Sequence, residues 1–187
     1  MTAHDPVTSE PATGPDLLEL LSEEHRAVEE LCAKLASGTG TGKHRTRLTD
    51  LVVAELSRHR FLEDRYLYPV ARELLVDDPP VADIDDAVRG LWKQGVVADL
   101  LDRVRAHVRT TEGVLFPRLR TACPQVRLAE LGQRVREARE LAPTRPHAQP
   151  PATSLWGRFT APVLGVADQV RDELTGRCTR VDRLSGR

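Results

Sequence analysis

The chain has 187 residues, of which 27 are basic and 28 acidic, so it is long enough for one domain with a buried core and its net charge is close to zero. This balance gives no general attraction to nucleic acid, and no apolar run approaches the roughly 18 residues that a membrane span needs. We therefore expect neither nucleic acid nor membrane among the partners of this protein.

The cysteines and the N-terminus bear on cellular location. Cys32, Cys123 and Cys178 stand far apart without a Cys-x-x-Cys motif. An odd number of separate cysteines fits a reducing compartment. The first residues have neither the basic start nor the apolar stretch of a secretory signal. The sequence thus predicts a cytoplasmic protein, and it identifies no protein partner.

The first half of the chain predicts an arm and two helices. Residues 1–15 are polar and contain prolines, so we expect a disordered arm. Leucines and valines recur at three- and four-residue steps from the N-cap candidate Asp16 to the glycine-rich stretch 38–42, which predicts a first helix. A second helix is predicted from about 44 to 75. It should kink at Pro69, because a proline inside a helix lacks the N–H and clashes with the preceding turn.

The second half predicts further helices and an extension. No part of it shows the alternation of a β-strand. The expected segments are a short third helix over about 82–94, a fourth helix over roughly 96–121, a fifth amphipathic stretch at 127–141, a proline-rich linker at 143–154 and an amphipathic tail at 155–176.

Together these elements predict an all-α fold. Helices joined by short breaks favour an up-down four-helix bundle with a shortened third helix. The bundle and its trailing helix should occupy residues 16–142. Residues 143–187 should form the linker and a C-terminal helical extension.

Three of the six histidines fall inside predicted helices, namely His25, His59 and His107. Residues that are equally far from the turn face each other in a helical hairpin, and the midpoint of 25 and 59 is residue 42, inside the glycine-rich turn. His25 and His59 are therefore expected to meet across the first hairpin. A single helical histidine is more often a surface or core residue, but three at matching heights indicate a site.

Glu63 lies one helical turn after His59 on the same face. A histidine and a carboxylate at this spacing, pointing into a bundle, provide half of a carboxylate-bridged metal site. Neutral imidazole and carboxylate together suit iron, manganese or zinc better than calcium or magnesium. The alternative is an exposed acid that pairs with an arginine of its own helix, such as Arg60 or Arg65.

A segment of the second helix, HRFLEDRYLYP (59–69), has a counterpart in the fourth, HVRTTEGVLFP (107–117). Both copies begin with His and end with Leu-aromatic-Pro, but Thr111 stands in the second copy where the first has its glutamate. Glu112 follows one residue later. On an undistorted helix it lies about 100° away, as a surface acid or as a partner of a ligand. A local π-bulge would instead bring Glu112 inward as a ligand.

These segments resemble the haemerythrin-like HHE cation-binding domain. The similar stretches are SEEHRAVEEL (22–31), LSRHRFLEDRYLYP (56–69) and RAHVRTTEGVLFPRL (105–119), and the proline-rich tail is similar to an extension of many bacterial members. The family pattern is a His on the first and third helices and His-x3-Glu on the second and fourth, around two metal ions that are usually iron. The resemblance implies that His25 and His59 ligate one metal, that Glu63 bridges, and that His107 belongs to the other metal.

The chain departs from the family pattern on its third and fourth helices. Asp85 stands where the third-helix histidine is expected, but it lies much closer to the DDPP turn (77–80) than Glu63 does. An acidic first turn, favoured by the helix dipole, is the preferred interpretation of Asp85. The spacing of His107 and Glu112 is the His-x4-acid spacing of the oxygen-carrying haemerythrins of invertebrates. One metal ion, or an incomplete pair, is therefore expected.

Three functions remain open at this point. The first is a non-haem iron protein, with manganese or zinc as other metals, that binds dioxygen, peroxide, nitric oxide or iron itself. The second is a bundle without metal that acts as a binding or regulatory protein. The third is an enzyme acting on a small organic substrate, but no nucleophile motif, phosphate-binding loop or nucleotide fingerprint supports it. The metal-site residues of the first are His25, His59, Glu63, His107 and Glu112.

Overall fold

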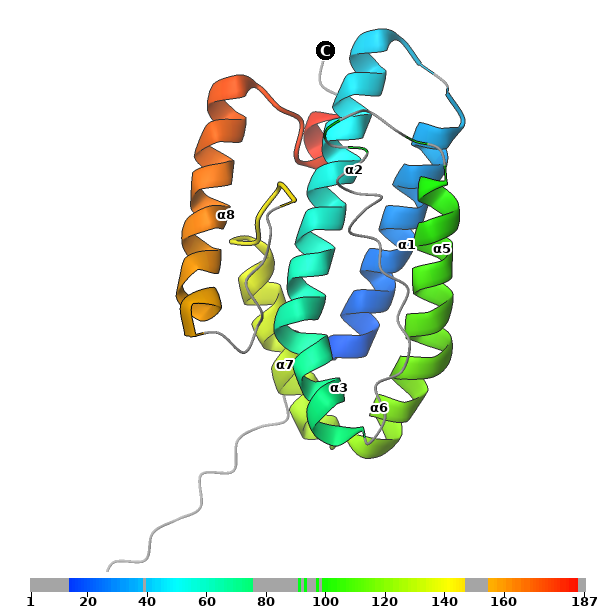
Figure 1. The fold of residues 1–187 in the computed structure, drawn as a ribbon, viewed down its shortest axis with the longest axis vertical. Helices are drawn as coiled ribbons and strands as arrows, with labels where there is room; N and C mark the ends of the chain where they lie inside the picture. Colours follow the sequence, from blue (N-terminus) through cyan, green and yellow to red (C-terminus); the bar gives the residue numbers. More distant parts are fainter. Residues whose placement is uncertain are drawn as a thin grey trace, which may run out of the picture.

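The structure is a computed structural model, and it describes residues 14–38, 40–75, 91, 93, 97, 99–146 and 155–184, without the side chains of 155–164 and 183. All regular secondary structure in these ranges is helical (Figure 1). The elements are α1 (Leu17–Ala36), α2 (Gly42–Leu62), the π-helical turn η1 (Glu63–Leu67), α3 (Tyr68–Leu74), α5 (Leu100–Thr110), the π-helical turn η2 (Thr111–Leu115), α6 (Phe116–Ala122), α7 (Gln125–Arg139), α8 (Leu155–Thr175) and the 3-10 turn η3 (Val181–Arg183).

The helix α1 lies at the centre of the packing. It contacts α2, α5 and α7, and α7 also contacts α2. Figure 1 shows α8 on the side of α2 that faces away from α5. The predicted all-α class is confirmed for this part of the chain. None of the helices described is long and apolar enough to cross a bilayer.

Several expectations fall outside the described residues. These are the arm before Gly14, most of the linker, and nearly all of the predicted third helix with Asp85. The fourth predicted helix begins at Leu100, because Asp99 before it has a φ of 62°. This left-handed conformation is not compatible with the interior of an α-helix.

Asp16 begins α1 as predicted. Its side chain accepts hydrogen bonds from the backbone N–H groups of Leu18 and Glu19, and the Glu19 side chain accepts from the Asp16 N–H, which completes a capping box. Arg120 of α6 and Gln125 of α7 also donate to the Asp16 carboxylate. The cap therefore ties the start of α1 to the α6–α7 connection.

We expect Asp16→Ala to lower the free energy of unfolding by about 1–2 kcal/mol, because the cap and the partner of a buried carboxylate are both lost. Burial alone would raise the pKa of Asp16, but hydrogen bonds from Gln125, the Glu19 backbone and Arg120 lower it below 3.8. Because the folded-state pKa is lowered, the ionised carboxylate contributes its full stabilisation above the unfolded-state value of 3.8. This stabilisation is lost as the pH falls through the folded-state pKa. Urea unfolding at pH 7 and pH 3 measures both effects.

Asp16→Asn is the control, because it keeps the oxygen that accepts the cap hydrogen bonds. It should lose less stability than the alanine variant at pH 7. An equal loss for Asp16→Ala at both pH values would contradict the assignment of this contribution to the ionised carboxylate.

Both copies of the repeated segment contain a π-helical turn at the same place. The i→i+5 hydrogen bond that closes η1 is donated by the N–H of Tyr68 to the carbonyl of Glu63. The one that closes η2 is donated by the N–H of Phe116 to the carbonyl of Thr111. Pro69 and Pro117 follow directly, in the first turn of α3 and α6, where a missing N–H is tolerated. The break expected at Pro69 is thus taken up by a π turn, and the second copy repeats it.

Two apolar clusters fill the interior. On α1, Leu17, Leu18 and Leu21 belong to the first cluster, while Val28 and the buried residues after it belong to the second. The buried residues of α2, and those of α5 together with η2, are divided between the two clusters in the same way. The histidines predicted as ligands occupy the level between the clusters on each helix: His25, His59 and His107.

Candidate metal centre

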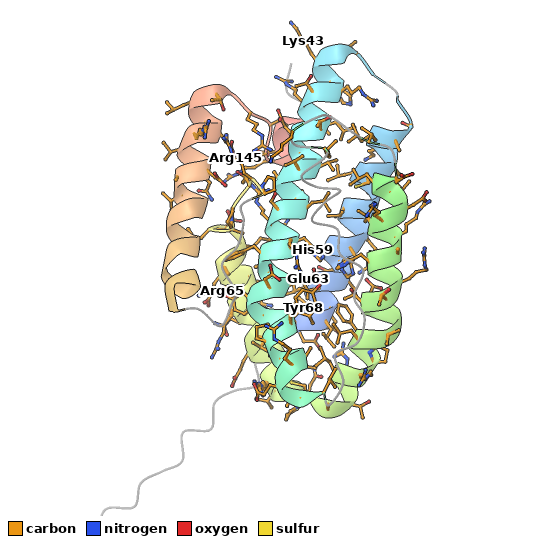
Figure 2. The ribbon with its side chains drawn as sticks, in the orientation of Figure 1. Lys43, His59, Glu63, Arg65, Tyr68 and Arg145 are labelled. Carbon is orange, nitrogen blue, oxygen red and sulfur yellow. The ribbon has the colours of Figure 1, made fainter. Side chains whose placement is uncertain are left out.

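Four buried side chains from α1, α2, η1 and α5 meet between the two clusters. They are His25 of α1, His59 of α2, Glu63 of η1 and His107 of α5. Each histidine is 2% exposed and Glu63 is 0% exposed. One ligand atom from each of the four lies within 4.8 Å of the others. Figure 2 shows His59 and Glu63 one above the other on the same side of α2 and its continuation, with Tyr68 below them.

The distances confirm the expected meeting across the first hairpin. The ring centroids of His25 and His59 are 4.7 Å apart, and that of His107 lies 5.5 and 5.7 Å from theirs. One carboxylate oxygen, Oε1 of Glu63, is 3.0 Å from Nε2 of His107 and 3.5 Å from Nε2 of His59. Glu63 is therefore not the exposed partner of an arginine that the sequence left as an alternative.

Two further carboxylates hold the outer nitrogens of the histidines. Nδ1 of His25 is 2.7 Å from Glu112 Oε1, and Nδ1 of His59 is 3.1 Å from Glu24 Oε2. A carboxylate at Nδ1 fixes the neutral ring in the tautomer that carries its proton there, so that Nε2 presents a lone pair. Nε2 of His25 and of His59 is buried and has no hydrogen-bond partner among the described residues.

The charges of the site also suit a cation. Burial lowers the pKa of His25 to about 4, with repulsion from His59 adding to the effect, so this ring is neutral at pH 7. Burial would lower the pKa of His59 as well, but the carboxylates of Glu63 and Glu24 raise it to about 10. Despite its burial, Glu63 keeps a pKa well below 4.5 because His59 and His107 face it. Without metal, a proton on His59 therefore balances the buried anion, and a metal ion would replace that proton.

The four donors are close enough together that they could hold a metal ion. Ligands placed tetrahedrally around zinc at normal distances lie about 3.4 Å from one another. The separations of 3.0 and 3.5 Å at Glu63 are close to this value, whereas the widest separation in the group, up to 4.8 Å, would have to shorten when a metal binds. The described residues contain one such group.

Glu112 is not among the four inner donors. Its side chain is 36% exposed, and it contacts the outer nitrogen of His25. The π turn that the sequence invoked to bring Glu112 inward is present, but Glu112 contacts Nδ1 of His25 from outside the group of four buried side chains.

Sequence reasoning missed Tyr68 and Glu24 at the site, and it noted Thr111 only as the residue that replaces the second glutamate. Tyr68 donates its hydroxyl to Glu63 Oε2 at 2.9 Å. Thr111 is fully buried, and its hydroxyl has no partner among the described residues. Glu24 could have been placed near His59 from the sequence, because the midpoint of 24 and 59 also falls in the turn between α1 and α2. Nothing in the sequence marks Tyr68, because its hydroxyl gains a role only when the π turn places it near Glu63.

We expect Tyr68→Phe to weaken metal binding by about 10-fold, because the hydroxyl fixes Oε2 of Glu63 and thereby directs Oε1 toward the histidines. Competition titration with a chelator measures the change. Tyr66→Phe is the control, since the Tyr66 ring stacks against Arg65. Equal affinities for the wild type and Tyr68→Phe would show that Glu63 needs no support from the hydroxyl.

The four side chains could also form a hydrogen-bonded cluster without metal. That reading leaves Nε2 of His25 buried without a partner, which costs about 1–3 kcal/mol. Metal ligation would satisfy this nitrogen and would also neutralise the buried carboxylate.

Comparison with known proteins gives no match, whether to a protein-family model, a curated protein or a solved structure.

Proposed function

We propose that this chain is a haemerythrin-like metal-binding protein with one non-haem centre formed by His25, His59, Glu63 and His107. The observation that carries the proposal is the pair of histidines held by carboxylates at Nδ1, while their buried Nε2 atoms, that of His59 lying 3.5 Å from Glu63 Oε1, make no hydrogen bond among the described residues. Imidazole and carboxylate ligands suit iron, and also manganese or zinc, and we propose iron. An up-down four-helix bundle with a short third helix over 82–94 is part of this proposal.

Iron with such ligands supplies an open coordination position for dioxygen, peroxide or nitric oxide. The protein provides the surroundings. Glu63 supplies the negative charge, and Glu24 and Glu112 hold the Nδ1 protons of the histidines. Phe116 stacks on His25 with ring centroids 5.9 Å apart, which keeps water from that face of the ligand.

A groove on the surface brings solvent close to the site. It has a volume of about 470 Å³ and runs between α1 on one side and η2 with the start of α6 on the other. Glu112 and Phe116, which both touch His25, form part of its wall. The groove therefore lies beside the two residues that cover His25, and we expect a small diatomic ligand or peroxide to approach the centre from this side.

Elemental analysis and an absorption spectrum of the aerobically purified protein test the proposal. We expect one transition-metal ion per chain and, with iron, a near-ultraviolet charge-transfer band. His59→Ala should lose both, because it removes a ligand of the centre. Metal loading that is unchanged in this variant would overturn the assignment of the site.

A metal-free protein with a binding or regulatory role is the second candidate. It is favoured by the 3.0 Å contact between His107 and Glu63, which pairs two members of the site without an ion. This candidate predicts no bound metal even after purification with added iron.

A further inference from the structure

The acid that holds His59 is itself held by an arginine of another helix. Glu24 uses one oxygen for Nδ1 of His59, at 3.1 Å, and its other oxygen accepts a hydrogen bond from Nη1 of Arg139, at the end of α7. The Glu24 side chain is only 11% exposed. A carboxylate this deeply buried is stable in one orientation only if both oxygens are satisfied, so Arg139 determines how Glu24 meets the histidine.

Arg139 is in turn one member of a longer chain of ionic contacts. Its Nη2 donates to Oε2 of Glu55 at 2.8 Å, and Oε1 of Glu55 accepts from Nη1 of Arg58 at 2.9 Å. Nη1 of Arg58 also donates to the backbone carbonyl of Thr179, 2.9 Å away. Glu55, Arg58 and Thr179 are each less than 10% exposed. A continuous path of ion pairs and hydrogen bonds therefore joins the C-terminal segment to His59, and its most exposed member is Arg139, whose side chain is 38% exposed.

The C-terminal segment is fixed against α2 at a second place. Arg177 lies after α8, and its Nε is 3.1 Å from Asp50 Oδ1. Arg177 also donates to the carbonyl of Thr144 and contacts Asp172 of α8. These contacts place residues 177–179 along α2, where the carbonyl of Thr179 meets Arg58. The position of Thr179 is thus set independently of the histidine site.

His25 provides an internal comparison. Its Nδ1 is held by Glu112, whose side chain is 36% exposed and lines the groove. The acid at His59 is 11% exposed and carries the arginine and its network. Each of the two histidines thus has a carboxylate at Nδ1, and among the described residues the carboxylate at His59 is the one connected to α7 and to the C-terminal segment.

We propose that Arg139 is a positioning residue for the metal ligand His59, acting through Glu24, and that the C-terminal segment keeps Arg139 in place through Arg58 and Glu55. This inference builds on the proposed function, because it assigns His59 to a metal. It gives α7 and the C-terminal extension a definite role, which is to set the affinity of the centre from outside the hairpin that carries most of the ligands.

The affinity of the full chain for Zn²⁺, used as the probe, tests the inference in a chelator competition. Loss of a group that orients a metal-bound histidine typically costs about 10–100-fold in affinity. We expect Arg139→Met to lie at the lower end of this range and Arg58→Met to show a smaller loss. Arg139→Lys should recover part of the affinity, since its ammonium keeps the charge but cannot serve both acids with a planar fork. Arg134→Met, an exposed position on the same helix, is the control and should bind as the wild type does.

A second measurement separates this inference from the proposed function. Proton NMR of the metal-free full chain with ¹⁵N-labelled histidine reports the exchange of each Nδ1 proton with water. In Arg139→Met the His59 proton should exchange faster, while the His25 proton, held by Glu112, should not change. If the wild type binds no metal, the proposed function fails, and this exchange experiment still decides the role of Arg139. Equal exchange in Arg139→Met and Arg134→Met would overturn the inference.

Discussion

Glu63→Gln should weaken metal binding by more than about 100-fold, beyond the effect expected for any residue that only orients a ligand. The carboxylate is the single anion among the four inner donors, and it is fully buried. A divalent ion in this interior needs a negative partner, since a buried charge without one is strongly unfavourable. Glutamine is similar in volume and can still accept the hydrogen bond from Tyr68, so the fold should persist.

Isothermal titration with Zn²⁺ and with Fe²⁺ under anaerobic conditions measures this loss. Glu30→Gln is the matched control, because it removes an acid of α1 whose side chain is 68% exposed and pairs with Lys34. The control should bind metal as the wild type does. Affinity retained in Glu63→Gln would show that the metal, if any, lies elsewhere in the chain.

Metal binding should also stabilise the protein. A ligand that binds only the folded state at 100 times its dissociation constant adds about 2.7 kcal/mol to the free energy of unfolding. For a chain of this size that corresponds to a rise in Tm of about 5–10 °C. Calorimetry with added metal measures the rise, and a chelator should reverse it.

His59→Ala is the control for this experiment, because it lacks one of the four donors and should show no rise. A wild type whose Tm does not respond to metal would favour the binding or regulatory protein without metal. A rise of equal size in His59→Ala would instead point to metal bound outside this cluster.

The sequence predicted the first hairpin and its histidines in detail, because helical registers can be counted from a turn. Periodicity and the breaks at glycine and proline were enough to place α1 and α2. The equal distances of 25 and 59 from the turn were enough to predict the 4.7 Å contact between the two rings. The repeated Leu-aromatic-Pro ending marked the places where the structure has its two π turns, although their form was anticipated only for the second.

Other features depend on tertiary packing that leaves no pattern in the chain. The fifth stretch was expected to trail the bundle, yet α7 packs on both α1 and α2. That placement permits Arg139 to contact Glu24, which lies more than a hundred positions away in the sequence. Glu112 illustrates a different limit. Its spacing from His107 allowed two roles, and only the backbone geometry of η2 places it on the outer side of His25.

The polar centre divides the hydrophobic interior into two blocks. Among the residues that the structure describes, the buried leucines and valines on either side of His25, His59 and His107 belong to separate clusters. In the metal-free protein each block can open on its own, so amide hydrogen exchange should report two levels of protection rather than one. An ion ligated from α1, α2, η1 and α5 would join the blocks, so the protein would unfold as a single cooperative unit.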